Sequence, residues 1–349
     1  MSSRREIVPR HDSLTSSAAR PPRIAVLIPC YNEELSIAKT VTAFRSVLPT
    51  ATIYVYENNS DDQTSARALQ AGAVVRAEKL QGKGNVVRRM FSDVEADVYL
   101  MVDGDATYDP TPARAMIELL LRDNLDMVVG KRMHADATAY RRGHVVGNRL
   151  LTALLCRLFR QSLTDILSGY RVLSRRFVKS FPALSTGFET ETELSVHALT
   201  LTMPIAEIAV DYAARVPGSA SKLDTYRDGW RILLFMLGLF KNERPMTFFG
   251  LAGAAFSLSS VLLSIPIFVT YLDSGLVPRF PTAILSASLM LLAFLSLVCG
   301  LVLDSVTRGR RELKRLSYLQ IPGPRCLFDD SRNVESPQDT PVFPRAAAS

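Results

Sequence analysis

The sequence has few of the residues that cross-link a chain or bind a structural metal. Its four cysteines, Cys30, Cys156, Cys299 and Cys326, are widely spaced and form no CxxC pair, which argues against a disulfide framework and a zinc site. The 18 glycines and 19 prolines are ordinary for 349 residues, and no repeat is visible, so solenoids and propellers are poor candidates. Residues 1–22 contain no apolar run, and no secretory signal is expected there.

Two long uncharged runs lie towards the carboxyl terminus. Residues 246–271 and 281–303 contain no charged side chain, and each exceeds the roughly 20 residues that a helix needs to cross about 30 Å of hydrocarbon. A buried hairpin of a soluble protein is the alternative, but soluble helices rarely stay apolar on every face over such a length. We therefore expect two transmembrane helices.

Basic residues flank this pair of runs on its outer sides. Lys and Arg number 41 against 34 Asp and Glu, a formal charge of +7. Several lie at 227–244 and 308–315, whereas the segment between the runs holds only Asp273 and Arg279 as charged residues. Because loops rich in Lys and Arg stay in the cytoplasm, both flanks and the large amino-terminal part are expected there. No motif supports a nucleic-acid partner.

From Arg23 onwards, short β-branched runs alternate with amphipathic helical stretches, the pattern of an α/β domain with a mostly parallel sheet. Strands are predicted at 24–28, 52–56, 74–76, 98–102 and 127–130, and helices at 34–47, 63–71, 83–94 and 112–122. In open α/β sheets, ligands bind at the carboxyl ends of the strands. The residues that follow the strands are therefore the candidates for a functional site.

Polar segments follow three of the predicted strands: PCYNEE after the first, ENNSDDQT after the second and DGDATY after the fourth. One pair of acids near a turn is usually a solvated loop, but three such segments favour a shared site. Asp103 and Asp105, two residues apart, would face one side of an extended strand end and suit a hard divalent cation on a diphosphate. Glu57 is placed to accept a hydrogen bond from a nucleobase, and nearby amides such as that of Asn59 suit ribose.

The segment QGKGN at residues 81–85 contributes glycines and a lysine. We predict that the glycines let the backbone approach a ligand closely and that Lys83 supplies charge towards phosphate. The residue after Lys83 is Gly84 rather than Ser or Thr, so the segment is not a Walker A loop and a P-loop NTPase is excluded.

Together these motifs resemble the inverting glycosyltransferases of family 2, which have a GT-A fold, and within them the polyprenyl-phosphate glycosyltransferases related to dolichol-phosphate mannose synthase. The resemblance covers about residues 24–223 and rests on IPCYNEE, YENNSDDQT, DGD, VVGKR, DILSGYR and RVPGSASKL. The apolar runs resemble the transmembrane hairpin of bacterial members, and residues 224–242 resemble helices that lie along the membrane surface.

The resemblance implies a role for each matching residue. The implied nucleotide-binding residues are Pro29, Tyr31, Glu33, Glu57, Asn59, Lys83 and Asp103. Asp103 and Asp105 are implied to bind Mg²⁺ or Mn²⁺, and the implied catalytic residues are Asp105, Asp165 and Arg171. Three positions depart from the pattern: Glu57 and Asn58 stand where the family more often has two aspartates, and Thr107 stands where mannose synthases commonly have glutamine. The donor sugar is therefore not inferred from the resemblance.

The acceptor can be considered from its charge. A polyprenyl monophosphate is largely dianionic at neutral pH, so it needs positioning and charge screening more than a base. The residues that fit this role are Arg132, Arg215, Ser219, Ser221 and Lys222. A hydroxyl acceptor would instead require a general base, for which Glu189 and Glu191 are the natural candidates; alternatively, Glu191 begins the exposed face of a helix. The isolated His134, His144 and His197 are predicted to be structural or surface residues.

The predicted domain organisation is a flexible tail (1–22), an α/β, Rossmann-like GT-A domain (23–223), juxtamembrane amphipathic helices (224–245), a transmembrane hairpin (246–304) and a basic segment with a flexible cytoplasmic tail (305–349). The expected activity is inverting transfer of one sugar from a nucleotide diphosphate sugar, with a UDP-sugar favoured, to undecaprenyl or polyprenyl phosphate. The expected location is the cytoplasmic face of the bacterial inner membrane. A lipid-linked saccharide or lipid hydroxyl acceptor, and a non-catalytic membrane scaffold, are the alternatives; self-association and a separate flippase remain open.

Overall fold

The structure is a computed structural model of the chain and describes residues 21–134, 163–187, 189–213, 237–238 and 240–324. In this part of the chain, seven strands form one sheet in the order β3-β2-β1-β4-β6-β5-β7. The strands are β1 (Ile24–Cys30), β2 (Thr52–Glu57), β3 (Val74–Ala77), β4 (Val98–Met101), β5 (Met127–His134), β6 (Arg171–Ser174) and β7 (Ile205–Tyr212). The helices around the sheet are α1 (Ile37–Val47), α2 (Thr64–Gln70), α3 (Lys83–Asp93), α4 (Ala113–Arg122), α6 (Arg175–Ser180) and α7 (Thr190–Thr200).

The sheet is mostly parallel, as the alternation of strand and helix patterns predicted. β1 pairs in parallel with β2 and β4, β2 with β3, and β5 with β7. Only β6 runs against its neighbours β4 and β5. All five predicted strands and all four predicted helices are present, with ends shifted by up to four residues. β6 and β7 were not predicted; β6 is only four residues long and becomes a strand through its two partners.

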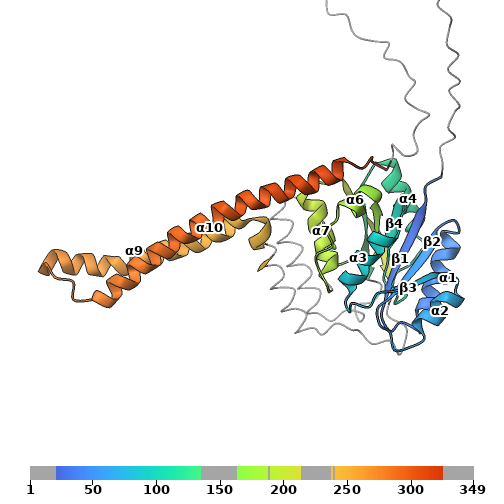
Figure 1. The fold of residues 1–349 in the computed structure, drawn as a ribbon, viewed down its shortest axis with the longest axis horizontal. Helices are drawn as coiled ribbons and strands as arrows, with labels where there is room; N and C mark the ends of the chain where they lie inside the picture. The colour runs from blue at the N-terminus through green and yellow to red at the C-terminus, as the bar shows by residue number, and fades with distance from the viewer. Residues whose placement is uncertain (1–20, 135–162, 188, 214–236, 239, 325–349) are drawn as a thin grey trace, which may run out of the picture.

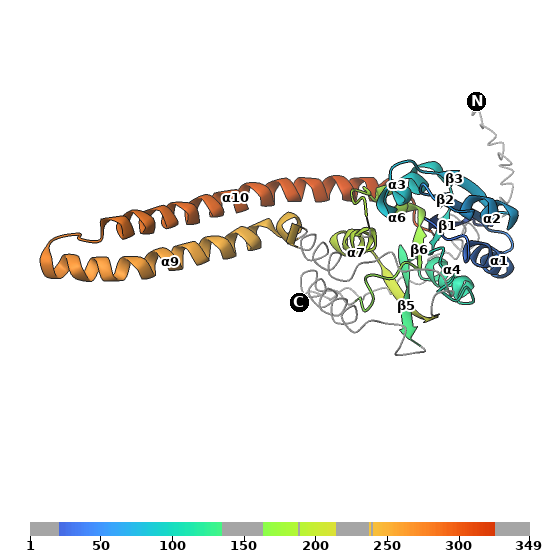
Figure 2. The ribbon, with the colours of Figure 1, turned by 90° about the horizontal axis from the view of Figure 1, so that it is seen from below.

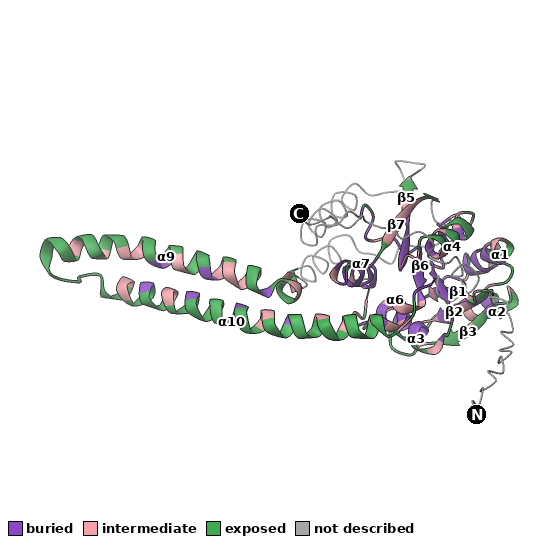
Figure 3. Cartoon of the chain, turned by 90° about the horizontal axis from the view of Figure 1, so that it is seen from above, coloured by how far each residue is buried: buried purple, intermediate pink, exposed green. Residues whose placement is uncertain are grey.

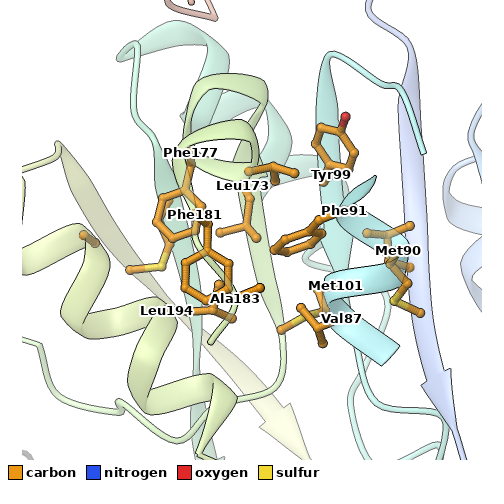
Figure 4. Packing of buried hydrophobic residues seen from close by; sticks show 14 of the residues in the cluster. Val87, Met90, Phe91, Tyr99, Met101, Leu173, Phe177, Phe181, Ala183 and Leu194 are labelled. Atoms are coloured by element: carbon orange, nitrogen blue, oxygen red, sulfur yellow. The ribbon is translucent and has the colours of Figure 1, made fainter. Parts of the chain in front are cut away.

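The two faces of the sheet are covered by different helices. Along β1, Ala25 and Leu27 belong to one apolar cluster and Val26 and Ile28 to the other, because side chains alternate across a strand. The first cluster includes residues of α3, α6 and α7, and the second includes residues of α1, α2 and α4. In the first cluster, Phe91 of α3 packs against Tyr99, with ring centroids 6.4 Å apart (Figure 4).

Two further helices form a hairpin that projects from this domain (Figures 1 and 2). α9 spans Pro245–Ser274 and α10 spans Phe280–Leu319, and both are long and apolar enough to cross a membrane. They contain the two apolar runs that the sequence indicated. Most of their side chains are exposed, and few are buried along the contact between them (Figure 3). The predicted basic segment from residue 305 is helical as far as Leu319; residues 325–349 lie outside the described part.

Candidate active site

The loops after β1 and β2 lie side by side because their strands are neighbours in the sheet. The backbone N–H of Glu33 donates to the hydroxyl of Thr64 at 2.8 Å, and the N–H of Asp61 donates to the side-chain oxygen of Asn32 at 2.9 Å. β4 lies on the other side of β1, and the hydroxyl of Ser36 donates to the carbonyl of Gly104 at 2.9 Å. The three polar segments therefore meet at one edge of the sheet.

Glu57 closes the turn that follows β2. One of its carboxylate oxygens accepts the N–H of Ser60 and the other accepts the N–H of Asn59, each at 3.1 Å. Asn59 has a positive φ of 59°, a conformation that asparagine tolerates well. Each carboxylate oxygen has a second lone pair, so these contacts leave Glu57 able to accept a further hydrogen bond.

Asn58 holds the segment that leads into α3. Its side-chain amide donates to the carbonyls of Glu78 and Leu80, both at 2.8 Å, and its side-chain oxygen accepts the N–H of Gly82 at 2.7 Å. An ionised aspartate could accept the last bond but could not make the first two. This set of contacts explains in physical terms why the chain has asparagine here, and the sequence pattern alone did not indicate it.

The glycines next to Lys83 approach the chain's own backbone. A Cβ added at Gly82 would lie 2.1 Å from the carbonyl oxygen of Thr186, and one at Gly84 would lie 2.2 Å from that of Ser185. Gly82 also has a φ of 128°, which L side chains rarely adopt. This close packing on residues 185–186 fixes the start of α3 against that loop, and the approach of the segment to a ligand stays a prediction.

Lys83 bridges two acids from distant parts of the sequence. Its ammonium lies 2.5 Å from a carboxylate oxygen of Asp103 and also forms an ion pair with Glu191. Burial lowers the pKa of Lys83, but the two carboxylates outweigh this effect and raise it well above its usual range. Lys83 is thus a fixed positive charge beside the DGD segment, as the sequence indicated.

Glu191 is buried, with 5% of its surface exposed. The interpretation that it begins the exposed face of a helix was wrong, because the first turn of α7 packs towards Lys83. Glu189 precedes α7 as its N-cap residue and is half-buried. The sequence did contain a signal for a buried role of Glu191. This acid lies at the start of a helix in which most of the remaining residues are apolar, Ser or Thr.

The DGD segment is a turn rather than a continuation of the strand. β4 ends at Met101, and Ala106 has a φ of 56°. The expectation that Asp103 and Asp105 face one side of an extended strand end, because side chains alternate along a strand, therefore does not apply. Asp105 is buried, and one of its oxygens accepts the hydroxyl of Thr107 at 2.6 Å. Asp103 turns instead towards Lys83 and is about one-third exposed, at 30%. A Cβ at Gly169 would lie 2.3 Å from a carboxylate oxygen of Asp103, so the glycine of DILSGYR makes room for this acid.

Asp165 forms a bidentate ion pair with Arg132 on β5. Its two oxygens accept from the guanidinium Nε and Nη2 at 2.7 and 2.8 Å. The backbone N–H of Asp165 donates to Glu207 on β7 at 3.2 Å. The Arg132 guanidinium also lies over the ring of Tyr212, 5.6 Å from its centroid. The pair is largely buried, with 10% and 7% of the two side chains exposed, so its geometry is well defined.

Arg171 lies inside the domain and holds the loop that carries Asp165. Its side chain is fully buried and donates to the carbonyls of Ile166 at 2.6 Å and Ser168 at 2.9 Å. Burial lowers the pKa of Arg171 to about 10, although the nearby Glu191 and Asp165 carboxylates counteract this effect. These contacts describe a residue that shapes the loop, rather than one that faces a substrate.

The remaining predicted residues divide into two groups. Pro29 is paired in register with Tyr56 on β2, and Tyr31 follows β1 at the same edge; both are half-buried. Glu33 is buried, and one of its carboxylate oxygens lies 3.0 Å from the hydroxyl oxygen of Ser36. Four predicted acceptor-binding residues lie outside the described part of the chain: Arg215, Ser219, Ser221 and Lys222.

The described part of the chain contains two histidines, His134 and His197. His197 is buried in α7, where its Nε2 lies 3.0 Å from the hydroxyl of Ser180, in agreement with a structural role. His144 is outside the described residues, and His134 ends β5. Among the described residues, no group of three or more His, Cys, Asp or Glu side chains could hold a metal ion by itself.

The chain is similar in sequence to glycosyltransferases. The sequence pattern of "Glycosyl transferase family 2" matches residues 25–181. "Glycosyltransferase AglJ" of Haloferax volcanii is 31% identical over 304 residues, which cover 86% of this chain and 99% of that protein. "Dolichol-phosphate mannosyltransferase" of Pyrococcus furiosus is 21% identical over 185 residues, covering 50% of this chain and 52% of that protein.

The fold is also found among solved structures. Glucosyl-3-phosphoglycerate synthase from Mycobacterium tuberculosis, in a complex with Mn²⁺, UDP and phosphoglyceric acid, superposes with a TM-score of 0.51 at 20% identity, covering 63% of this chain and 78% of that one. This likeness supports the GT-A fold of the domain. With the match to AglJ over most of both chains, it follows that the chain belongs to glycosyl transferase family 2 and is a glycosyltransferase.

Proposed function

We propose that this glycosyltransferase moves one sugar from a nucleotide diphosphate sugar, with a UDP-sugar favoured, to a polyprenyl phosphate, with inversion at the anomeric carbon. One observation carries the proposal: a family 2 domain with acids and fixed cations at one edge of its sheet is joined to two helices that could span a membrane. The named activity of the dolichol-phosphate mannosyltransferase relative supports a lipid phosphate acceptor.

The donor site consists of the segments after β1, β2 and β4. Glu57 would accept a hydrogen bond from the nucleobase, with Asn59 close by and with Pro29, Tyr31 and Glu33 at the same edge. Lys83 would place its charge beside the diphosphate, because its ammonium is held next to Asp103. The UDP complex of the related fold supports a uridine nucleotide as the first donor to test.

Asp103 and Asp105 would provide the carboxylates for a divalent cation shared with the donor. Magnesium commonly uses one or two carboxylates and completes its shell with substrate phosphates and water, so the absence of a larger acidic cluster among the described residues is compatible with such a site. In that position Mg²⁺ or Mn²⁺ supplies positive charge to the leaving nucleoside diphosphate. The metal in the related solved structure supports this choice.

The charges of the site suit an acceptor that needs no general base. A lipid phosphate brings its own nucleophilic oxygen, so the protein has to position it and screen its repulsion from the donor. Arg132 would provide one cation, oriented by its bidentate pairing with Asp165. Glu191 is a poor candidate for a base, because its carboxylate is buried and already held in an ion pair with Lys83.

The hairpin would hold the site close to the acceptor. We place the catalytic domain in the cytoplasm and the two helices in the bacterial inner membrane, because basic residues such as Arg308 and Arg310 follow the second span whereas the connecting segment is poor in them. The lipid phosphate would then be presented at the headgroup level on the side of the catalytic domain.

The proposal can be tested with purified protein, undecaprenyl phosphate, Mg²⁺ or Mn²⁺ and a panel of UDP- and GDP-sugars, by measuring glycolipid mass and released nucleotide. We expect a monoglycosylated lipid phosphate from one donor and a loss of at least about 100-fold in the Asp105→Asn variant. Asp123→Ala, which removes an exposed acid paired with its neighbour Arg122, is the matched control. Product formed only on a lipid-linked saccharide or lipid alcohol would refute the proposed acceptor.

A further inference from the structure

The contact face of α10 follows a seven-residue spacing. Its buried residues are Ser286, Ala293, Gly300 and Thr307, each seven positions after the one before. This spacing returns to the same side of a helix after two turns, with a slight left-handed drift. One face of α10 therefore continues from the apolar run into the charged part of the helix.

Along the apolar run this face packs against α9. The hydroxyl of Ser260 donates to the carbonyl of Ser286 at 2.8 Å, and a Cβ at Gly253 would lie 3.1 Å from the carbonyl oxygen of Ala293. Small residues at these positions allow the two backbones to approach closely. Figures 2 and 3 show the two helices side by side along the hairpin.

Beyond the apolar run the same face contacts the residues that lead into α9. The hydroxyl of Thr307 donates to the carbonyl of Asn242 at 3.0 Å. Four residues later, Arg311 donates to a carboxylate oxygen of Glu243 at 3.2 Å. These contacts stabilise α10 as a straight continuation of the hairpin outside the apolar region.

The end of α10 is docked on the catalytic domain. The phenol of Tyr318 donates to a carboxylate oxygen of Asp126 at 2.7 Å. Asp126 is fully buried and also binds Arg176, whose guanidinium lies 4.8 Å from the centroid of the Tyr318 ring. After the helix, a Cβ at Gly323 would lie 2.9 Å from the same guanidinium. Tyr318 thus donates a hydrogen bond to Asp126 and places its aromatic ring against Arg176, the two members of a buried ion pair.

This contact lies at the edge of the sheet opposite the candidate active site. Asp126 immediately precedes β5, and its carbonyl accepts the N–H of Ser174, the last residue of β6. Ser174 pairs with Val98 at the start of β4, whereas Asp103 follows the end of β4. From Leu303 to Tyr318 the helix rises about 22 Å, so α10 can reach this edge without a flexible linker.

We propose that Tyr318 is a positioning residue: through it, α10 acts as a rigid strut that fixes the catalytic domain at a set height and orientation above the lipid surface. The proposal rests on the membrane location and lipid phosphate acceptor given under the proposed function. Fixing the domain in this way favours encounter of the site with a headgroup-level phosphate, because fewer orientations have to be searched.

The test compares two acceptors in enzyme reconstituted into vesicles: undecaprenyl phosphate in the bilayer and a short, water-soluble prenyl phosphate. In Tyr318→Ala we expect the rate with the bilayer acceptor to fall at least fivefold and the rate with the soluble acceptor to stay within twofold. Tyr318→Phe keeps the ring over Arg176 and should lose less. Leu319→Ala, at a side chain that is 68% exposed, is the matched control and should change neither rate.

Hydrogen exchange of the peptides that cover residues 304–319 provides a readout that does not depend on activity. We expect exchange to accelerate at least tenfold in Tyr318→Ala and not in Leu319→Ala. An equal loss of rate with both acceptors, or faster exchange with both rates unchanged, would overturn the positioning role. If the unmodified protein glycosylates neither acceptor, the proposed function has failed. Unchanged hydrogen exchange in Tyr318→Ala would separately overturn the proposal that Tyr318 holds α10 on the catalytic domain.

Discussion

Replacing Asn58 by aspartate would restore the residue that the family pattern favours at this position, and we expect it to destabilise this chain. The substitution keeps the shape of the side chain but removes both hydrogen bonds to the carbonyls of Glu78 and Leu80. It also places a carboxylate against those two carbonyl oxygens in a buried position, where Asn58 is 3% exposed.

The magnitude follows from the contacts. Two lost hydrogen bonds cost about 1 kcal/mol each, and a buried carboxylate without donors for its second oxygen costs about 1–3 kcal/mol more. The N–H of Gly82 would make a stronger bond to a charged oxygen and offset about 1 kcal/mol. The net decrease in the free energy of unfolding should be about 2–4 kcal/mol.

The assay is urea-induced unfolding of the detergent-solubilised protein, followed by far-ultraviolet circular dichroism. Asn59→Asp is the control, because Asn59 is exposed and the same substitution there should cost less than about 1 kcal/mol. Burial should raise the pKa of the new carboxyl group at position 58. Its protonation then restores one donor, so the deficit should shrink as the pH is lowered. Equal stability of the two variants, or a deficit that grows at low pH, would refute this reasoning.

Two further predictions concern packing and pH. Gly84→Ala should lower the free energy of unfolding by about 1–3 kcal/mol, because its Cβ would meet the carbonyl oxygen of Ser185 at 2.2 Å. Gly309→Ala, with open space around it, should instead raise the free energy of unfolding by up to about 1 kcal/mol. Similar unfolding midpoints for the two variants would contradict this prediction. Burial lowers the pKa of His197 to about 3, so below about pH 6.5 only the unfolded chain takes up this proton. Relative to His197→Gln, the unmodified protein should therefore lose about 2 kcal/mol between pH 7 and pH 5, and parallel stability curves for the two proteins would count against it.

The sequence predicted the elements whose pattern is local. β1 and β2 are short runs rich in β-branched or aromatic residues, and α4 has apolar residues at helical spacing, so both types of element could be recognised. The ends were less accurate: β4 stops at Met101 because the DGD segment turns, and α10 continues to Leu319 through charged residues that a search for apolar runs does not follow. β6 is strand only because β4 and β5 flank it.

The candidate site was predicted in part. That the segments after β1, β2 and β4 meet at one edge followed from the rule that the ends of parallel strands coincide. The pairing of Lys83 with Glu191, and that of Arg132 with Asp165, join residues far apart in the chain, and no local pattern indicates them. Arg171 was expected near the reaction centre, but its surroundings are the carbonyls of its own loop.

The sequence by itself determined the class of fold, the two candidate membrane spans and the edge of the sheet at which the polar residues gather, because side-chain periodicity and hydropathy act over short stretches of chain. The tertiary structure decided which acids are buried, which cations they pair with, and that Tyr318 at the end of α10 returns to the domain at Asp126. These features depend on which distant segments exclude water from a charge, and that is settled only when the elements pack.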